Sequence, residues 1–219
     1  MTRLVLVRHG ESMATVKRIV GGPRSDTGLS ELGRRQSAAL RDRLARTGEI
    51  KADALVSSAL PRASQTAEIL APALGGLEVV KVEDLREHDP GPEIDGKAWA
   101  DVTVGKDPWH WENEPYLAGF PGGETVAEFH FRAATALHKV LAEHVGRTVV
   151  VVTHGGVIDV AMRSLFRLPL VGGFHLWTLN TSLTELSRRD EPDAHWVLRR
   201  YNDVAHLDGM PNDSLPDGS

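Results

Sequence analysis

The sequence has no cysteine among its 219 residues. This absence excludes disulfide bonds and thiolate metal sites, and it fits a reducing compartment. The chain also lacks a hydrophobic run that approaches the roughly 18 apolar residues of a membrane span. Near the N-terminus, Arg8 and Glu11 interrupt the apolar residues too early for a secretory signal. We therefore expect a cytoplasmic protein with no membrane contact.

The chain lacks an excess of positive charge as well. Its 25 lysines and arginines face 30 aspartates and glutamates, which gives a formal net charge of -5. This balance supplies no broad basic face for a nucleic-acid backbone, so we expect no nucleic-acid partner and only local anion sites. The length and the hydrophobic content of 41% suit one domain. We place that domain at residues 1–207 and expect a disordered tail, rich in Pro, Asp and Gly, over 208–219.

Apolar runs alternate with amphipathic segments along the chain. Helices are predicted from the cap at Ser30 to Gly48, from Pro61 through Leu74, and from Val126 through Leu141. The order predicts the α/β class, with a mainly parallel sheet, helices on both faces in a three-layer sandwich, and right-handed crossovers. Short apolar runs predict the strands, at residues 4–7, 54–56, 78–82, 149–152, 183–186 and 196–198.

The segment 97–123 fits no regular element. Prolines, glycines and acids surround its aromatic residues, which predicts a loop-rich flap rather than helix or strand. Excursions of this kind commonly cover active sites. Its cluster of Trp109, His110 and Trp111 is interpreted either as part of a flap that packs on itself or as a wall that selects the substrate. Glu124 is expected to cap the following helix through its carboxylate.

Two predicted strands end in a histidine. Arg8 and His9 follow the first apolar run, and His154 follows the run at 149–152. Open α/β sheets bind ligands at the carboxyl ends of their parallel strands, so both histidines are expected in one crevice. Arg62, in the first turn of a predicted helix, approaches the same crevice from a third connection.

This set of side chains suits a phosphoryl group. Guanidiniums provide forked donors for phosphate oxygens, while helix N-termini and glycines such as Gly155 bring backbone amides close to a ligand. A neutral imidazole among these donors can attack phosphorus and form a phosphohistidine, while the second imidazole and the arginines stabilise the charge. An alkoxide is a poor leaving group, so a nearby carboxylic acid must protonate it. Glu87, which follows the third predicted strand, is placed to do so.

Six ordered segments closely resemble the motifs of the histidine phosphatase superfamily, the phosphoglycerate mutase-like proteins. The resemblance spans most of the chain and implies that His9 is the phosphorylated nucleophile. It implies that Arg8, Arg62 and His154 form the phosphate pocket. It also implies that Glu87 donates a proton and later activates water, with no metal or other cofactor, because arginines and histidines neutralise the charge. The segments are LVRHGES at 6–12, LSELG at 29–33, SSALPRASQTA at 57–67, LRE at 85–87, PGGET at 121–125 and VTHGG at 152–156.

Two departures from the family pattern affect the pocket. Thr15 stands where the family often has an asparagine, so this phosphate donor is a hydroxyl or is absent. After Glu87, the pair Asp95-Gly96 keeps the register of the family's Trp-Glu-Gly turn without the tryptophan. Because the altered turn can shift Glu87, His88 and Asp89 stay open as alternatives for the acid.

The leading interpretation is a metal-independent phosphomonoesterase, from the phosphatase branch, that acts on a small phosphorylated metabolite. The first alternative is a mutase of the same fold, which would favour a more basic entrance than the segment 97–123 supplies. The second is a noncatalytic module for phosphorylated ligands, which would need the arginines but neither a nucleophile nor an acid. The substrate stays open, as does whether the C-terminal strand forms a homodimer interface or completes the sheet. The charged residues of the entrance are Lys97, Lys106, Asp101, Asp107, Glu112 and Glu114.

Overall fold

One six-stranded sheet, in the order β3-β2-β4-β1-β5-β6, forms the centre of the computed structural model, which describes residues 1–103, 114–172, 174, 176–191 and 193–212. The first four strands along the chain are parallel, β5 is antiparallel to β1, and β6 is antiparallel to β5. The mainly parallel sheet is therefore confirmed. The strands are β1 (Thr2–Arg8), β2 (Ala54–Ser58), β3 (Val79–Val82), β4 (Thr148–Thr153), β5 (Leu183–Arg188) and β6 (Val197–Asp203).

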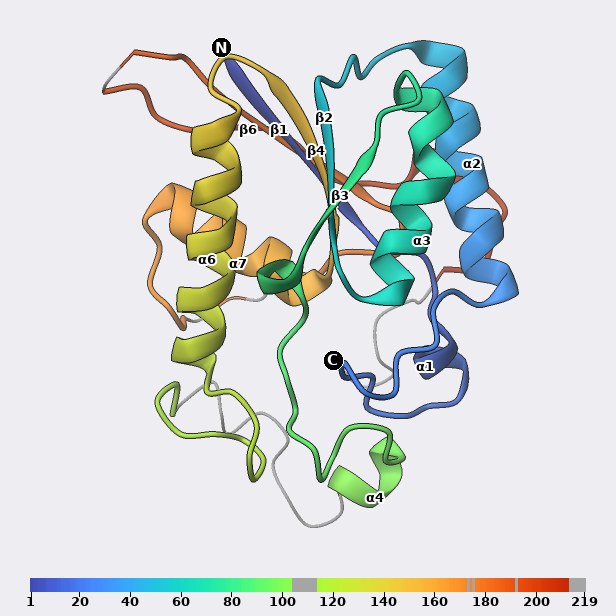
Figure 1. Ribbon diagram of the computed structural model, residues 1–219, viewed down its shortest axis with the longest axis vertical. Helices are drawn as coiled ribbons and strands as arrows, with labels where there is room; N and C mark the ends of the chain where they lie inside the picture. The colour runs from blue at the N-terminus through green and yellow to red at the C-terminus, as the bar shows by residue number, and fades with distance from the viewer. Residues whose placement is uncertain (104–113, 173, 175, 192, 213–219) are drawn as a thin grey trace.

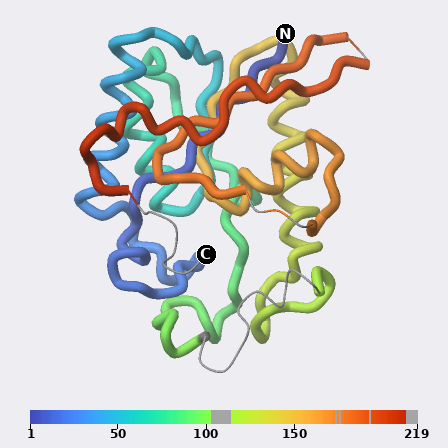
Figure 2. Tube along the Cα trace, turned by 180° about the vertical axis from the view of Figure 1, so that it is seen from behind, coloured from blue at the N-terminus to red at the C-terminus, as the bar shows by residue number. Residues whose placement is uncertain are grey.

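Helices cover both faces of the sheet (Figure 1). On one face lie α2 (Glu31–Thr47) and α3 (Pro61–Leu70), and on the other lie α6 (Val126–Glu143) and α7 (Gly155–Phe166). Each face of the sheet has its own hydrophobic core. Leu4 and Leu6 of β1 pack into one core, and Val5 and Val7 pack into the other, which is the pattern of a strand buried on both faces. The three-layer arrangement is thus confirmed. Figure 2 shows the antiparallel pair β5 and β6, in orange and red, from behind.

The helix ends follow the local sequence signals. Ser30 Oγ accepts the amide of Gly33 at the start of α2, and Gly48, which ends this helix, has a left-handed φ of 59°. Helix α6 begins differently from the expectation. Thr125 and Glu128 form a reciprocal capping box there. Glu124 therefore does not cap α6, and its carboxylate pairs instead with Arg132 further along this helix.

Short helical segments complete the chain, among them α1 (Met13–Val16) and the 3-10 turns η1 (Ala71–Leu74), η2 (Glu83–Leu85) and η3 (Ala205–Leu207). One of them, α4 (Trp99–Thr103), lies in the segment 97–123 that was expected to lack helix. That expectation is wrong at α4, because Val102 is buried there in a small cluster with Val20 and Ile94. Trp109, His110 and Trp111 lie outside the described residues.

The start of the expected C-terminal tail is held to the domain. The amide nitrogen of the Gln36 side chain donates to the Pro211 carbonyl over 3.0 Å, and the Asn180 amide donates to Asn212 Oδ1 over 3.2 Å. The described part of the segment 208–219 therefore makes specific hydrogen bonds. Residues 213–219 lie outside the described residues.

Candidate active site

The two strand-end histidines lie side by side. Strands β1 and β4 are adjacent and parallel, with Arg8 opposite Thr153. The residues that follow them, His9 after β1 and His154 after β4, therefore lie at the same edge of the sheet. Their ring centroids are 5.1 Å apart, and both side chains are buried. The sheet register alone therefore brings together two groups that are far apart in the sequence, as the strand pattern predicts.

Arg62 connects these two rings. It lies in the first turn of α3, which begins at Pro61, and its side chain is buried. Its Nε donates to His9 Nε2 over 3.2 Å and to His154 Nδ1 over 3.3 Å. A guanidinium held between two imidazoles is placed to receive an anion at the same point.

Hydrogen bonding fixes the proton positions on both rings. His9 Nδ1 lies 2.7 Å from the Gly10 carbonyl, which only accepts, so Nδ1 carries the hydrogen and Nε2 keeps its lone pair. His154 accepts from Arg62 at Nδ1, so its Nε2 donates to Ser58 Oγ over 2.8 Å.

Burial, reinforced by the nearby Arg62 and Arg8 guanidiniums, holds the pKa of His9 well below 6.5. Burial and the charge of Arg62 lower the pKa of His154 in the same direction. Both rings are therefore neutral at pH 7, and His9 Nε2 is an unprotonated nitrogen that can act as a nucleophile.

Arg8 approaches from the end of β1. One of its Nη atoms donates to the Thr178 carbonyl. A Cβ atom at Gly155 would lie 3.8 Å from Arg8 Nε, so the Arg8 guanidinium lies beside the start of α7. The N-terminus of this helix has no side-chain cap, and its amides add positive potential beside the histidines.

Glu87 lies at the same helix terminus. Its Oε2 accepts the amide of Gly156 over 3.0 Å, and its Oε1 accepts the amide of His88 over 3.0 Å. A Cβ atom at position 156 would overlap Glu87 Oε1, so this contact needs glycine there. The structure thus brings Glu87 next to the turn that carries His154.

The two alternatives for the acid make contacts elsewhere. His88 Nε2 donates to the Glu124 carbonyl over 2.8 Å. Asp89 Oδ1 accepts the amide of Gly91 over 2.9 Å and lies 3.5 Å from the guanidinium of Arg24. Of the three candidates, Glu87 has the carboxylate that reaches the start of α7.

Thr15 lies in α1, where its amide donates to Ser12 Oγ and its hydroxyl is 3.1 Å from the same oxygen. These local bonds stabilise the short helix. A phosphate contact from Thr15 stays a prediction.

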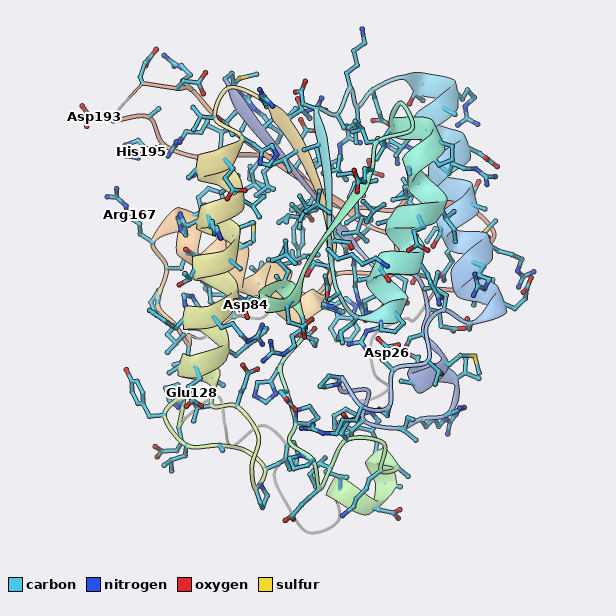
Figure 3. The ribbon with its side chains drawn as sticks, viewed as in Figure 1. Asp26, Asp84, Glu128, Arg167, Asp193 and His195 are labelled. Carbon is cyan, nitrogen blue, oxygen red and sulfur yellow. The ribbon has the colours of Figure 1, made fainter. Side chains whose placement is uncertain are left out.

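Asp26 is a component of the site that sequence reasoning missed. Its carboxylate, 1% exposed, accepts from Arg62 Nη1 over 3.0 Å and also from the Gly28 amide. Asp26 lies beneath the start of α3 (Figure 3). In the sequence, Asp26 is recognisable only as a turn residue two positions before Gly28. Such a turn does not predict that the aspartate pairs with an arginine of α3.

Asp95, in the turn that follows Glu87, is bonded to the loop that carries Asp26. Its buried carboxylate accepts backbone amides from Gly22, Arg24 and Ser25. The Asp95-Gly96 pair therefore has a structural role in fixing the loop 20–26, although its turn lacks the aromatic residue of the family pattern.

The described residues contain no candidate metal cluster and no candidate membrane span. No three His, Asp or Glu side chains in this part of the chain are grouped so that they could hold a metal ion. No helix in the same part is long and apolar enough to cross a membrane.

Several known proteins are similar to this chain in sequence and fold. The family model of the histidine phosphatase superfamily (branch 1) matches residues 4–204. A metal-independent phosphoserine phosphatase of Arabidopsis thaliana is 33% identical, over 96% of this chain and 85% of its own. A probable phosphoglycerate mutase, GpmB, of Yersinia pestis is 31% identical, over 98% of this chain and 99% of its own. A mycobacterial glucosyl-3-phosphoglycerate phosphatase, solved with VO3, is 30% identical with a TM-score of 0.75, covering 91% of this chain and 98% of that one.

Proposed function

Because the chain belongs to the histidine phosphatase superfamily (branch 1), we propose that it hydrolyses a small phosphorylated metabolite through a phosphohistidine on His9. The observation that carries the proposal is the placement of Arg62 Nε between His9 Nε2 and His154 Nδ1. This arrangement sets a neutral nucleophile and a fixed positive charge around one point, as phosphoryl transfer requires.

In the first step, His9 Nε2 attacks phosphorus while the bond from phosphorus to the alcohol oxygen breaks. The Arg62 Nε–H turns from His9 Nε2 to a phosphoryl oxygen, and the Arg8 guanidinium binds another. A direct phosphate contact from His154 stays a prediction, because its Nε2–H donates to Ser58 Oγ. Glu87, as the carboxylic acid, gives its proton to the departing oxygen, so an alcohol leaves and Glu87 becomes a carboxylate. These contacts strengthen as charge builds on the phosphoryl oxygens.

In the second step, water attacks the phosphorus of the phosphohistidine. The Glu87 carboxylate takes a proton from this water, the P–N bond breaks, and His9 Nε2 regains its lone pair. Inorganic phosphate leaves, and Glu87 is again an acid for the next cycle. One carboxyl group therefore serves both steps, which fits its position at the start of α7.

We propose that no metal ion takes part, because the Arg8 and Arg62 guanidiniums supply the charge neutralisation that Mg²⁺ supplies in other phosphoryl-transfer enzymes. The similarity to the metal-independent phosphoserine phosphatase of Arabidopsis supports this proposal. The names of that relative and of the mycobacterial neighbour also support a small phosphorylated substrate.

A mutase is the second candidate, favoured by the likeness to the probable phosphoglycerate mutase of Yersinia pestis. A mutase returns the phosphoryl group from His9 to a second hydroxyl, so it must keep water out. A noncatalytic phosphate-binding module has less support, because binding alone requires neither an unprotonated His9 Nε2 nor a carboxyl group at Glu87.

The test compares the purified protein with its His9→Ala variant, both in EDTA. Phosphate release is measured from phenyl phosphate, phosphoserine and 3-phosphoglycerate. Release by the wild type and a loss of at least about 10⁴-fold in the variant would support the proposal. Equal release by both proteins would contradict it, and so would a requirement for added metal. Conversion of 3-phosphoglycerate to its 2-phospho isomer without phosphate release would favour the mutase.

A further inference from the structure

The backbone around Glu87 is held by one arginine of α6. Arg132 Nη1 donates to the carbonyl of Asp84 over 2.8 Å and to that of Arg86 over 3.2 Å. Its Nη2 donates to the carbonyl of Glu87 itself over 3.3 Å. Asp84 lies at η2 beside α6 (Figure 3), so the residues 84–89, called the acid segment below, pass this helix just before they reach the site.

Glu124 completes this contact as the partner of Arg132. The two side chains form a bidentate pair, with distances of 2.6 Å from Nε to Oε1 and 2.7 Å from Nη2 to Oε2. Glu124 Oε2 also accepts the amide of Asp89 over 2.9 Å, and its backbone carbonyl accepts from the His88 ring. The pair therefore contacts the chain on both sides of Glu87.

Glu124 is ionised in this arrangement. Burial acts to raise the pKa of its carboxyl group, but hydrogen bonds from Arg132 and from the Asp89 amide outweigh burial and hold that pKa below its ordinary value. An ionised, bidentate pair has a fixed geometry, which a single flexible contact would not have.

The sheet gives this segment little support. The preceding strand, β3, lies at the edge, and none of its four residues is buried. Beyond it, Leu85 is buried and its carbonyl accepts from Thr153 Oγ1 over 3.0 Å. From Arg86 to Asp89, hydrogen bonds with Arg132 and Glu124 hold the backbone to α6 and to the residue before its cap, in addition to the bond between the Glu87 carboxylate and the Gly156 amide.

We propose that the pair of Glu124 and Arg132 is a positioning device that sets where the Glu87 carboxyl group lies relative to the departing oxygen. The proposal rests on the function proposed above, in which Glu87 donates a proton. Proton transfer needs donor and acceptor within about 2.6–3.2 Å, so a small displacement of Glu87 weakens it. The loss falls on substrates whose leaving group must be protonated and spares those whose leaving group is already stable.

Arg163 offers a matched control. In α7, its Nε donates to Asp159 over 2.6 Å, and its Nη atoms donate to the carbonyls of Pro169 and Phe174. Its guanidinium lies over the ring of Phe174, as that of Arg132 lies over Phe129. Replacing either arginine by lysine removes the same kinds of contact, but only Arg132 touches the acid segment.

The test measures kcat/KM for benzyl phosphate and phenyl phosphate, which share an aromatic ring but release an alkoxide and a phenoxide. The ratio of the two values does not depend on how much of each variant is folded. We expect Glu87→Gln to lower the benzyl-to-phenyl ratio about 100-fold and Arg132→Lys about 10-fold. Arg163→Lys should change it less than about 2-fold, and the double variant Glu87→Gln/Arg132→Lys should match Glu87→Gln alone.

Each other outcome has a definite meaning. An unchanged ratio in Arg132→Lys, with the expected drop in Glu87→Gln, would overturn the positioning role and leave the proposed function intact. A double variant that loses the product of the two single effects would show that Arg132 acts independently of Glu87, and would also overturn it. Absence of His9-dependent release from the wild type would remove the proposed function and this proposal together.

Discussion

The phosphate pocket and the acid segment are built in opposite ways. His9 and His154 extend from two adjacent strands in the interior of the sheet, and the register of β1 and β4 fixes their separation. Glu87 follows an exposed edge strand and is held by side chains and helix amides from elsewhere in the chain. The comparison teaches that the nucleophile depends on the sheet, whereas the acid depends on tertiary contacts that can be altered one at a time.

Removal of the Arg62 side chain should cause the largest loss of activity among the pocket variants. We expect Arg62→Ala to lower kcat/KM about 10³-fold, because its guanidinium contacts both histidines and the charge that builds on the phosphoryl group. The loss should be similar for phenyl and benzyl phosphate, since the pocket serves both. A loss confined to benzyl phosphate would mean that Arg62 assists protonation of the leaving group and does not bind the phosphoryl group.

A substitution at Gly156 should disturb the Glu87 carboxyl group without changing the phosphate pocket. A methyl group there would meet Glu87 Oε1, so Gly156→Ala should displace the carboxyl group from α7. We expect a loss of about 10- to 100-fold on benzyl phosphate and less than about 3-fold on phenyl phosphate. Steady-state kinetics on the two substrates checks this. Equal losses would mean that the methyl group disturbs the pocket rather than the acid.

Asp26 tests the support behind the pocket. Asp26→Asn keeps the shape of the side chain but removes the charge that pairs with the buried Arg62. We expect roughly a 10-fold loss on both substrates, together with a lower Tm, because one charge of a buried pair is left without its partner. The exposed pair of Glu68 and Lys81 is the control, and Glu68→Gln should change neither quantity. If Asp26→Asn changed neither the activity nor the Tm, the pair of Asp26 and Arg62 would have no role in supporting the pocket.

The smallest expected effect is on stability against pH. The folded protein keeps His9 neutral because its pKa lies well below 6.5, whereas the unfolded chain protonates this residue near 6.5. Below pH 6.5 the unfolded state therefore binds more protons, and the free energy of unfolding falls as the pH falls. Between about pH 7.5 and 5.5, His9→Ala should lose up to about 1.4 kcal/mol less stability than the wild type in urea unfolding. Equal pH slopes would contradict a neutral, buried His9.

The parts of the molecule that sequence predicts are those set by local pattern. The strands, the Ser30 cap, the Gly48 end and the meeting of His9 with His154 all follow from apolar runs, cap residues and parallel pairing. Asp26 gives no such signal, because its partner Arg62 is brought near only by the packing of α3. The expectation that Glu124 caps α6 was wrong because its carboxylate pairs with Arg132, further along the same helix, and accepts the Asp89 amide, whose position is set by tertiary structure.

The helix α4 was missed for a related reason. Its segment is rich in residues that favour turns, and only the burial of Val102 against Val20 and Ile94 supports a helix there. Tertiary packing outweighs local propensity in so short an element.

Trapping of the phosphoenzyme tests the central claim most directly. The wild type is mixed with phenyl phosphate, quenched within milliseconds in base, and digested for mass spectrometry. A P–N bond to histidine survives base and is lost in acid, unlike a phosphate ester. We predict one added phosphoryl group on the peptide that contains His9, absent after acid treatment and absent from His9→Ala. A phosphoryl group on another residue, or a phosphoenzyme that persists in His9→Ala, would contradict the account.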